Sequence, residues 1–337
     1  MMRAGDALRR WGVPVTLATA LAVFAVFGVY LSPRWLFFLQ TVFVLGLFAV
    51  ATNLLVGYGG LVSFGQASFY GLGAYVLALG WLHYKAPFVL LFVLAPVFGA
   101  VAALVVGALA LRARHLYFAL LTLAFSQLFF TIANQWYGFT SGANGVFGAM
   151  VPRVLAAPRV GYWFILAVSF VSIFLLWLVK ISPFGLTLQA IRENRKRAEA
   201  IGVDVYRHQL YAFVIAGAFA ALAGALFVVH DQSAYPGLLD WTKSGEPILM
   251  AMIGGLDHFL GPLVGAAVFQ FAHDYLLKHT HAWELVLGLV LLAIVLFAPD
   301  GLLGVLSWRN RASSGSVRVR LARILGAAAE EDGRDHK

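Results

Sequence analysis

The alternation of apolar and charged positions divides the chain into long charge-free runs separated by short basic clusters. A membrane-spanning helix needs about 20 consecutive apolar residues. Four runs have this length, namely residues 13–32, 86–111, 161–179 and 208–230. Two stretches are much longer, because the 50 residues between Arg34 and Lys85 and the 38 between Arg114 and Arg153 carry no charge. We expect two spans in the first stretch, and a span followed by an apolar exterior loop in the second.

The basic clusters set the expected orientation, because Lys and Arg are retained in cytoplasmic loops. They lie at Arg3, Arg9 and Arg10, at Arg112 and Arg114, within residues 182–208, and at Arg309, Arg311, Arg318, Arg320 and Arg323. We expect seven spans in the first part of the chain, at 13–32, 36–56, 61–83, 88–111, 116–137, 161–180 and 208–230. Every basic cluster then lies inside if residues 247–278 cross twice, or enter and return, before a last span near 285–306. The largest exterior loops are then 138–160 and 231–246.

These spans predict an all-α polytopic membrane protein with about ten passes. Residues 1–307 form the transmembrane domain, with a cytoplasmic loop at 181–207, and residues 308–337 form a basic cytoplasmic tail. Gly59 begins "GGLVSF" and Gly254 begins "GGLDHF", and each precedes a helix rich in small residues. This internal similarity favours two pseudo-repeated halves with glycine-broken segments, because transporter repeats show up as weak similarity of this kind.

Composition agrees with a chain embedded in a lipid bilayer. Hydrophobic residues make up 61% of its 337 positions and charged residues only 12%, against about a quarter in soluble domains. The net charge of +9 is explained by the positive-inside bias, so no nucleic-acid partner is needed. There is no cysteine for a disulfide or a thiolate site. The apolar run after the N-terminus exceeds a signal-peptide core, and we expect it to be an uncleaved first span.

Residues 182–208, called here the charged segment, combine eight charges with a helical pattern. Burying these charges in lipid would cost on the order of 20 kcal/mol, so the segment lies outside the bilayer. Good helix formers follow the turn "SPFG", Leu188, Ile191, Ala198 and Ile201 lie near one face, and Gly202 is placed to end the helix. Such a helix suits docking onto another protein. A positive-inside loop that happens to be helical is the alternative.

The glycine-rich residues 57–74 predict a broken or closely packed helix. Irregular backbone at membrane depth is tolerated only where it is buried in protein or lines a cavity. Ser63, Gln66 and Ser68 within it are candidates for a translocation pathway, although packing of small residues between helices also explains the glycines. The corresponding Gly254 and Gly255 belong to the same prediction. Asn53 and Gln127 are isolated polar groups in apolar spans, for which hydrogen bonding between helices is the alternative to lining a pathway.

Ionisable residues in apolar surroundings are functional candidates by default. Asp257 with His258, and Asp231 with His230, are the candidates, although a turn in water would also accommodate Asp257. A metal site can be drawn from His273, Asp274, His279 and His281, but the neighbouring Lys278 and Trp283 indicate a membrane rim. We predict no metal.

Six blocks, taken together and in order, resemble the permeases of branched-chain amino acid ABC importers, LivM type. The blocks are "NLLVGYGGLVSFGQASFYGLGAY" from Asn53, "LRARHLYFALLTLAFSQ" from Leu111, "TSGANG" from Thr140, "AIRENRKRAEAIGVDV" with "FVIAGAFAALAGAL" from Ala190, "GGLDHFLGPLVGA" from Gly254 and "LFAPDGLLG" from Leu296. Three positions depart from the family pattern. Gln66 replaces a histidine, Ser126 and Gln127 stand where an acid is common, and "TSG" replaces "TGG".

The resemblance implies a division of labour among subunits. Two ABC ATPase subunits would hydrolyse ATP, and this chain has no phosphate-binding G-x-x-x-x-G-K-[ST] motif, so we expect no cofactor on it. A homologous second permease subunit would complete the pore, and a periplasmic solute-binding protein would deliver the solute to the exterior loops. The location implied is a bacterial inner membrane, crossed many times, with both termini cytoplasmic. The expected solute is a branched-chain or related amino acid, with urea or short amides as the alternative.

The charged segment would then be the ATPase-coupling helix. The residues expected to contact or frame the ATPase are Leu188, Ile191, Arg192, Glu193, Arg195, Ala198, Glu199, Ile201 and Gly202. In particular, Leu188, Ile191 and Ile201 are expected to fill a groove on the ATPase. Two other classes of function have weaker support. A carrier driven by ions needs a buried acid that several spans lack, and an enzyme would show a catalytic spacing such as H-E-x-x-H.

Overall fold

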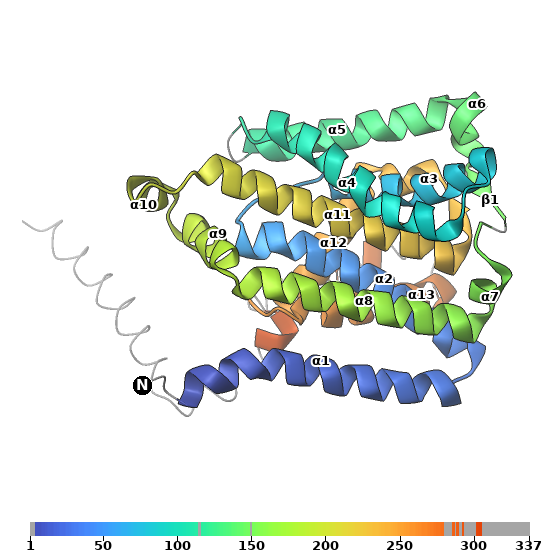
Figure 1. The fold of residues 1–337 in the computed structure, drawn as a ribbon, viewed down its shortest axis with the longest axis horizontal. Helices are drawn as coiled ribbons and strands as arrows, with labels where there is room; N and C mark the ends of the chain where they lie inside the picture. Colours follow the sequence, from blue (N-terminus) through green and yellow to red (C-terminus); the bar gives the residue numbers. More distant parts are fainter. Residues whose placement is uncertain are drawn as a thin grey trace, which may run out of the picture.

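The computed structural model describes residues 4–113, 116–148 and 150–279, together with 285–286, 288–289, 292 and 301–304. The predicted last span and the basic tail at 308–337 therefore lie almost entirely outside the described residues. Long helices lie roughly side by side and are joined by short connections (Figure 1).

The helices follow the predicted spans closely in the first two thirds of the chain. The longer helices are α1 (Ala4–Tyr30), α2 (Pro33–Asn53), α3 (Gln66–Tyr84), α4 (Phe88–Ala110), α5 (Leu116–Gln135), α8 (Pro158–Ile181), α11 (Val205–Asp231) and α13 (Gly261–His279). The shorter helices are η1 (Leu54–Tyr58), α6 (Tyr137–Thr140), η2 (Gly142–Asn144), α7 (Arg153–Ala156), α9 (Pro183–Glu193), α10 (Arg195–Ala200), η3 (Pro236–Leu239) and α12 (Trp241–Gly254).

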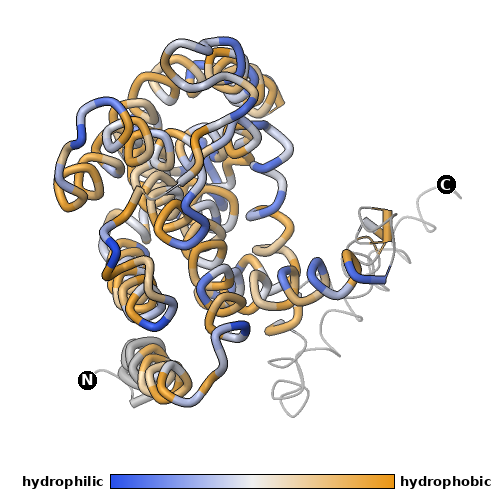
Figure 2. Tube along the Cα trace, turned by 90° about the vertical axis from the view of Figure 1, so that its right-hand side faces the viewer, coloured by the Kyte–Doolittle hydropathy of each residue, from blue (hydrophilic) through white to orange (hydrophobic). Residues whose placement is uncertain are grey.

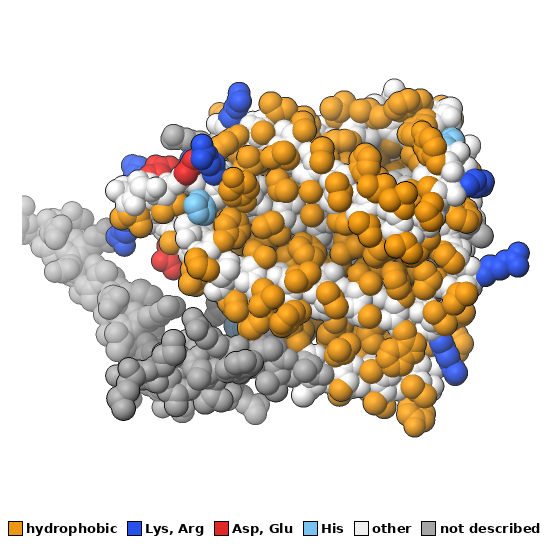
Figure 3. Space-filling model, viewed as in Figure 1, with side chains coloured by type: hydrophobic (Ala, Val, Ile, Leu, Met, Phe, Trp, Pro, Cys, Tyr) orange, Lys and Arg blue, Asp and Glu red, His pale blue; other side chains and the backbone are white. Residues whose placement is uncertain are grey.

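The described helices have the composition of a membrane protein. Five of them are long and apolar enough to cross a bilayer, counting α2 together with η1 as one. Hydrophobic residues dominate the helices, and hydrophilic ones gather mainly in the connections (Figure 2). The visible flank of the molecule is covered by hydrophobic side chains, and the charged side chains lie toward its two ends (Figure 3). The all-α membrane fold is thereby confirmed, while the count of ten passes and the pseudo-repeat stay predictions.

Helix α11 lies at the centre of the bundle and packs against α2, α3 and α4. A ridge of small residues four positions apart explains this packing, because Ala212, Ala216 and Ala220 are fully buried. A Cβ added to Gly224 would lie 1.8 Å from the carbonyl oxygen of Tyr70 on α3, a separation that no side chain tolerates. The backbones of α3 and α11 therefore touch, as small residues permit in membrane proteins.

The glycine-rich segment is broken as predicted. Helix α2 widens into the π-helix η1, residues 59–65 are not helical, and α3 begins only at Gln66, five residues later than the expected span. Gly60 has φ +65°, a conformation that glycine adopts without strain. The break turns the chain back into the bundle after α2.

Residues 247–278 form two helices of unequal length. Helix α12 has 14 residues and ends near the charged segment, whereas α13 has 19 and leads away from it. At about 1.5 Å per residue, α12 is roughly 21 Å long, too short to cross a 30 Å hydrocarbon layer alone. This pair agrees with the expectation that the region is irregular. Helix α12 begins at Trp241, however, so the prediction of an exterior loop at 231–246 is wrong for residues 241–246.

The two predicted exterior loops meet at the end of the bundle opposite the charged segment, called here the opposite end. The strand β1 (Val146–Phe147) pairs antiparallel with β2 (Ser233–Ala234). Gly145 has φ +70° and approaches the carbonyl oxygen of Ala234, a contact closed to larger residues. The two loops thus form one surface rather than two independent flaps.

Candidate functional site

The charged segment forms two helices instead of the single predicted one. Ser182 caps α9 by accepting a hydrogen bond from the backbone N–H of Gly185. Asn194 has extended backbone angles, φ −156° and ψ 95°, and its side chain caps α10 by accepting from the N–H of Arg197 at 2.9 Å. The break follows from the strong preference of asparagine for the N-cap position, where it competes with a continuous helix.

The apolar residues of the charged segment divide into an internal and an external set. Leu188 is fully buried in the main core, and Ile191 and Ala198 pack with Val205 at the start of α11. Ile201 is 76% exposed. The interpretation that Leu188 and Ile191 fill a groove on a partner is therefore wrong, because both side chains are already covered by this chain. Of the three apolar residues expected to fill that groove, Ile201 alone is available for a partner.

A surface cleft of about 370 Å³ lies at the break between α9 and α10. It is lined by Ala190, Glu193, Asn194, Arg197, Ala198 and Ile201. Beside it, Arg195 Nε contacts Glu199 Oε1 at 2.9 Å, one turn apart on α10. Both side chains are 40% or more exposed, so this ion pair adds little stability. Gly202 has φ +86° and follows the end of α10, in agreement with the prediction that it ends the helix. The segment thus offers a polar cleft with one apolar edge.

Two basic residues, one in the charged segment and one just before it, contact the rest of the bundle. Arg192 donates to the carbonyl oxygen of Gly57 in η1, and its guanidinium contacts Asp257 Oδ1 at 3.1 Å. Lys180, in the last turn of α8, lies over the rings of Tyr58, at 5.0 Å, and Phe259, at 5.6 Å. Each cation thereby contacts both the η1 region and the connection between α12 and α13.

The end of α2 lies close to the second Gly-Gly-Leu-x-x-Phe segment. Asn53 Nδ2 donates to the carbonyl oxygen of Leu256 at 3.1 Å. A Cβ added to Gly254 would lie 1.7 Å from the carbonyl oxygen of Gly261, and Gly255 has φ 109°. Three of the predicted pathway residues therefore form a tight junction next to the charged segment, namely Asn53, Gly254 and Gly255. Their geometry is that of close backbone packing.

Ser63, Gln66 and Ser68 form a second group, at the start of α3. All three are buried. Ser63 accepts a hydrogen bond from the N–H of Gly65, and the neighbouring Ala67 N–H donates to Ser244 of α12 at 2.8 Å. Within the described residues, neither amide atom of Gln66 nor the hydroxyl of Ser68 has a hydrogen-bond partner. Native proteins leave few buried polar groups unpaired, and those few commonly have a role beyond packing.

Gln127 does not join either group. It is exposed on α5, whereas its neighbour Ser126 is buried and donates to the carbonyl oxygen of Leu239 at 2.8 Å. The metal site weighed from the sequence falls partly outside the described residues, because His281 is not among them. In the part that is described, no three potential metal-ligating side chains come together.

Sequence reasoning missed an ionic cluster at the opposite end. Lys243 and Glu246 of α12 form an ion pair of 2.7 Å beside His230 and His273. We had assigned 231–246 to an exterior loop, where charges are unremarkable. The stretch "DWTKSGEP" carried the missed signal, since Asp240 is a good N-cap and caps α12 through the N–H of Thr242.

Comparison with known proteins agrees with this fold. The family described as the permease component of branched-chain amino acid transport systems matches residues 35–296, and the chain belongs to this family. Its members are transport permeases, and the sequence-based assignment to them is confirmed. No solved structure matches the chain significantly.

Three relatives show the range of the similarity. The high-affinity branched-chain amino acid permease protein LivM of Salmonella typhimurium is 25% identical over 293 residues, covering 79% of this chain and 69% of the relative. A probable branched-chain amino acid permease, LivH of Methanocaldococcus jannaschii, is 29% identical over 143 residues, 38% of this chain and 43% of the relative. The autoinducer 2 permease LsrC of Shigella flexneri is 29% identical over 171 residues, 47% of each chain. The similarity therefore extends to permeases of different solutes.

Proposed function

We propose that this chain is the membrane-spanning permease subunit of a binding-protein-dependent ABC importer that moves branched-chain or related amino acids inward. Separate ATPase subunits power it, and a homologous second permease completes the pore. The observation that carries the proposal is the charged segment, whose α9–α10 cleft is exposed while Arg192 joins it to η1 and to the connection between α12 and α13. Lys180, two residues before the segment, contacts the same two parts. A partner that moves this segment moves both parts with it.

The ATPase subunits dock on the charged segment from the cytoplasm. Ile201 and the charged rim formed by Glu193, Arg195 and Glu199 are the contact residues, because they are partly or fully exposed around the cleft. Leu188, Ile191 and Ala198 serve this contact indirectly by fixing α9 and α10 to the bundle. The segment contacts the aqueous phase, since the cost of burying its charges excludes it from lipid.

The solute-binding protein docks at the opposite end, which faces the periplasm. The paired strands β1 and β2 unite the loops 138–160 and 231–246 into one surface there. Inside the bundle, the buried and unpaired Gln66 and Ser68 at the start of α3 are the groups of this chain that line the pathway. Urea or short amides are the alternative solutes, because an unpaired amide such as Gln66 also suits a neutral polar molecule.

Uptake by the reconstituted importer tests the coupling role. Vesicles hold the permease pair and the ATPase subunits, and the binding protein delivers labelled leucine. We expect Glu199→Lys to abolish ATP-dependent uptake and ATPase association while leaving membrane insertion intact, because Glu199 is exposed and its loss leaves no buried charge. Arg153→Glu, an exposed charge reversal at the opposite end, is the control and should keep the ATPase bound. Normal ATP-dependent uptake by Glu199→Lys would contradict the proposal.

A further inference from the structure

A cavity of about 210 Å³ lies between α2, α11, α12 and α13 at the opposite end of the bundle. Pockets for drug-sized ligands hold roughly 300–1,000 Å³, so this cavity suits a smaller molecule. Val44, Leu45, Phe227 and Phe269 give it an apolar wall. A wider groove of about 590 Å³ adjoins it and shares Phe37, Thr41 and Gln270, so the cavity continues toward the ends of α2 and α13.

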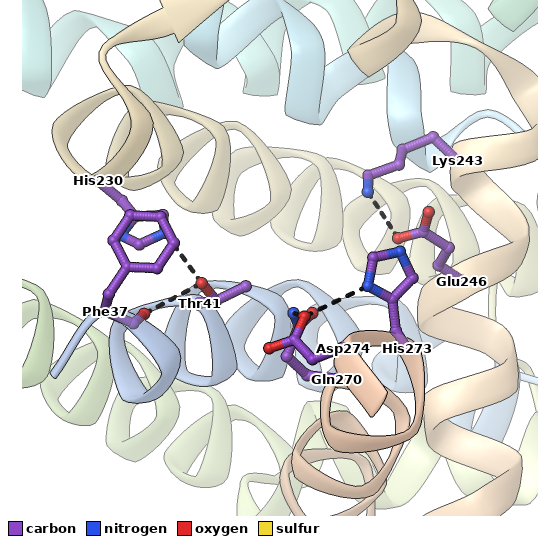
Figure 4. A network of polar contacts seen from close by, with 8 residues as sticks. All are labelled: Phe37, Thr41, His230, Lys243, Glu246, Gln270, His273 and Asp274. Carbon is purple, nitrogen blue, oxygen red and sulfur yellow. Dashed lines mark hydrogen bonds and ion pairs between the residues drawn. The ribbon is translucent and has the colours of Figure 1, made fainter. Parts of the chain in front are cut away.

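The remaining wall of the cavity is ionic (Figure 4). Lys243 Nζ and Glu246 Oε2, both on α12, are 2.7 Å apart, and their side chains are 23% and 28% exposed. His273 and Gln270 of α13 lie beneath this pair, and Asp274 accepts a hydrogen bond from Gln270 at 2.8 Å. The ion pair therefore lies against the cavity and away from the outer surface of the helix.

The side of the cavity facing this pair is fixed by hydrogen bonds. Gln40 Nε2 donates to the carbonyl oxygen of Pro158 at 3.0 Å, which turns its Oε1 toward His230 Nδ1 at 2.9 Å. Because an amide oxygen only accepts, His230 Nδ1 carries the hydrogen, and its Nε2 lies 2.9 Å from the hydroxyl oxygen of Thr41. The His230 ring also contacts Phe37, with ring centres 4.0 Å apart. These contacts hold the His230 side of the wall in place. Asp231, next to His230, also lines the cavity, and its carboxylate accepts a hydrogen bond from the hydroxyl of Ser233.

A half-buried ion pair in a membrane bundle calls for a function. Removing two charges from water costs more than their attraction returns in many proteins, and apolar replacements are often as stable. Ionisable groups at such positions are functional candidates by default. Ser244, next to Lys243, accepts from the N–H of Ala67 beside Gln66, so the first turn of α12 separates the cavity from the predicted pathway.

We infer that this cavity is an exterior-side binding site for a zwitterionic amino acid with an aliphatic side chain. The inference rests on the proposed function and names the part of the chain that first receives the solute. Lys243 binds the carboxylate, Glu246 binds the ammonium group, and the apolar wall takes the side chain. Bound solute exchanges the single Lys243–Glu246 contact for two charge-assisted contacts, so both charges stay paired whether the site is empty or full.

Saturation-transfer NMR on the purified importer complex tests the site with L-leucine at millimolar concentration. The key variant combines Lys243→Gln with Glu246→Gln, which removes both charges and leaves no unpaired one. We expect its thermal midpoint to stay near that of the unmodified protein and its affinity for leucine to fall roughly tenfold or more, as loss of charge-assisted hydrogen bonds entails. Leucinamide and 4-methylpentanoate, which lack one charge each, should bind the unmodified protein more weakly than leucine.

A matched control uses another ion pair between residues three positions apart. Arg207 and Asp204 are 3.0 Å apart at the start of α11, and Arg207→Gln with Asp204→Asn should leave leucine binding unchanged. Leucine binding kept by the Lys243 and Glu246 double variant, or equal binding of the two singly charged analogues, would overturn the inference. Failure of ATP-dependent uptake in the unmodified importer, with leucine binding retained, would contradict the proposed function and leave this site standing.

Discussion

Arg192 and Asp257 lie 65 positions apart in the sequence, yet their side chains meet at 3.1 Å beside the backbone of Gly57. This contact joins three parts of the molecule, namely α9, η1 and the connection after α12. Asp257 is 74% exposed, so the ion pair itself contributes little energy. The more important partner is the carbonyl oxygen of Gly57, which belongs to the broken end of α2.

The first prediction concerns this junction. We expect Arg192→Met to lower ATP-dependent uptake about tenfold while lowering the thermal midpoint by only a few degrees, because a partly exposed hydrogen bond to a charged group contributes roughly 1.5 kcal/mol. Asp257→Asn is the control, and it should keep most of the uptake because the bond to Gly57 remains. Equal losses in the two variants would show that the ion pair matters more than the carbonyl contact.

The second prediction separates anchoring from docking in the charged segment. Leu188→Ala should destabilise the protein by about 2–5 kcal/mol, since it leaves a cavity in a fully buried site. Ile201→Ala should leave the thermal midpoint unchanged, because the side chain is 76% exposed, but should weaken co-purification of the ATPase subunits. Unchanged ATPase binding by Ile201→Ala would remove Ile201 from the contact surface.

The third prediction uses two glycines of one helix. Gly254→Ala should prevent folding, because the added Cβ would lie 1.7 Å from the carbonyl oxygen of Gly261. Gly245→Ala, where the added Cβ meets nothing within 4 Å, should be neutral or stabilise by up to about 1 kcal/mol through better helix propensity. Expression level and thermal midpoint measure both. Folded Gly254→Ala protein would mean that the α12–α13 junction can open.

The fourth prediction addresses the buried amide of Gln66. Gln66→Leu removes polar atoms that have no partner among the described residues, so its thermal midpoint should stay or rise. Uptake should nevertheless fall about tenfold if the amide lines the pathway. Gln127→Leu, on the exposed face of α5, should change neither quantity. A stabilised Gln66→Leu protein with full uptake would assign this residue to packing alone.

The sequence predicted the long helices well because the hydrophobicity of a span accumulates over about 20 consecutive residues. Each of α4, α8 and α11 contains a charge-free run of about span length, and no tertiary contact is needed to recognise it. The glycine break before α3 was also predictable, since six glycines within residues 57–74 oppose a straight helix.

Features that depend on one competing residue or on distant partners were not predictable in this way. Around Asn194 the helix formers favour one continuous helix, and only the cap bond to Arg197 shows that the chain breaks there. The burial of Leu188 and Ile191 depends on contacts with other parts of the chain, which periodicity cannot reveal. Lys243 and Glu246 resemble a solvated loop until α2, α11 and α13 enclose them.

The central position of α11 has a mechanical consequence. This helix begins at the cap of Asp204, directly after α10, and continues without interruption for 27 residues to the strand β2. At about 1.5 Å per residue it is a rod of roughly 40 Å. Contact between the backbones of α11 and α3 at Gly224 leaves it little freedom to bend or slide alone. A displacement of the charged segment therefore moves α11 as one rigid body and reaches the opposite end. A displacement that begins at the opposite end is transmitted to the charged segment in the same way.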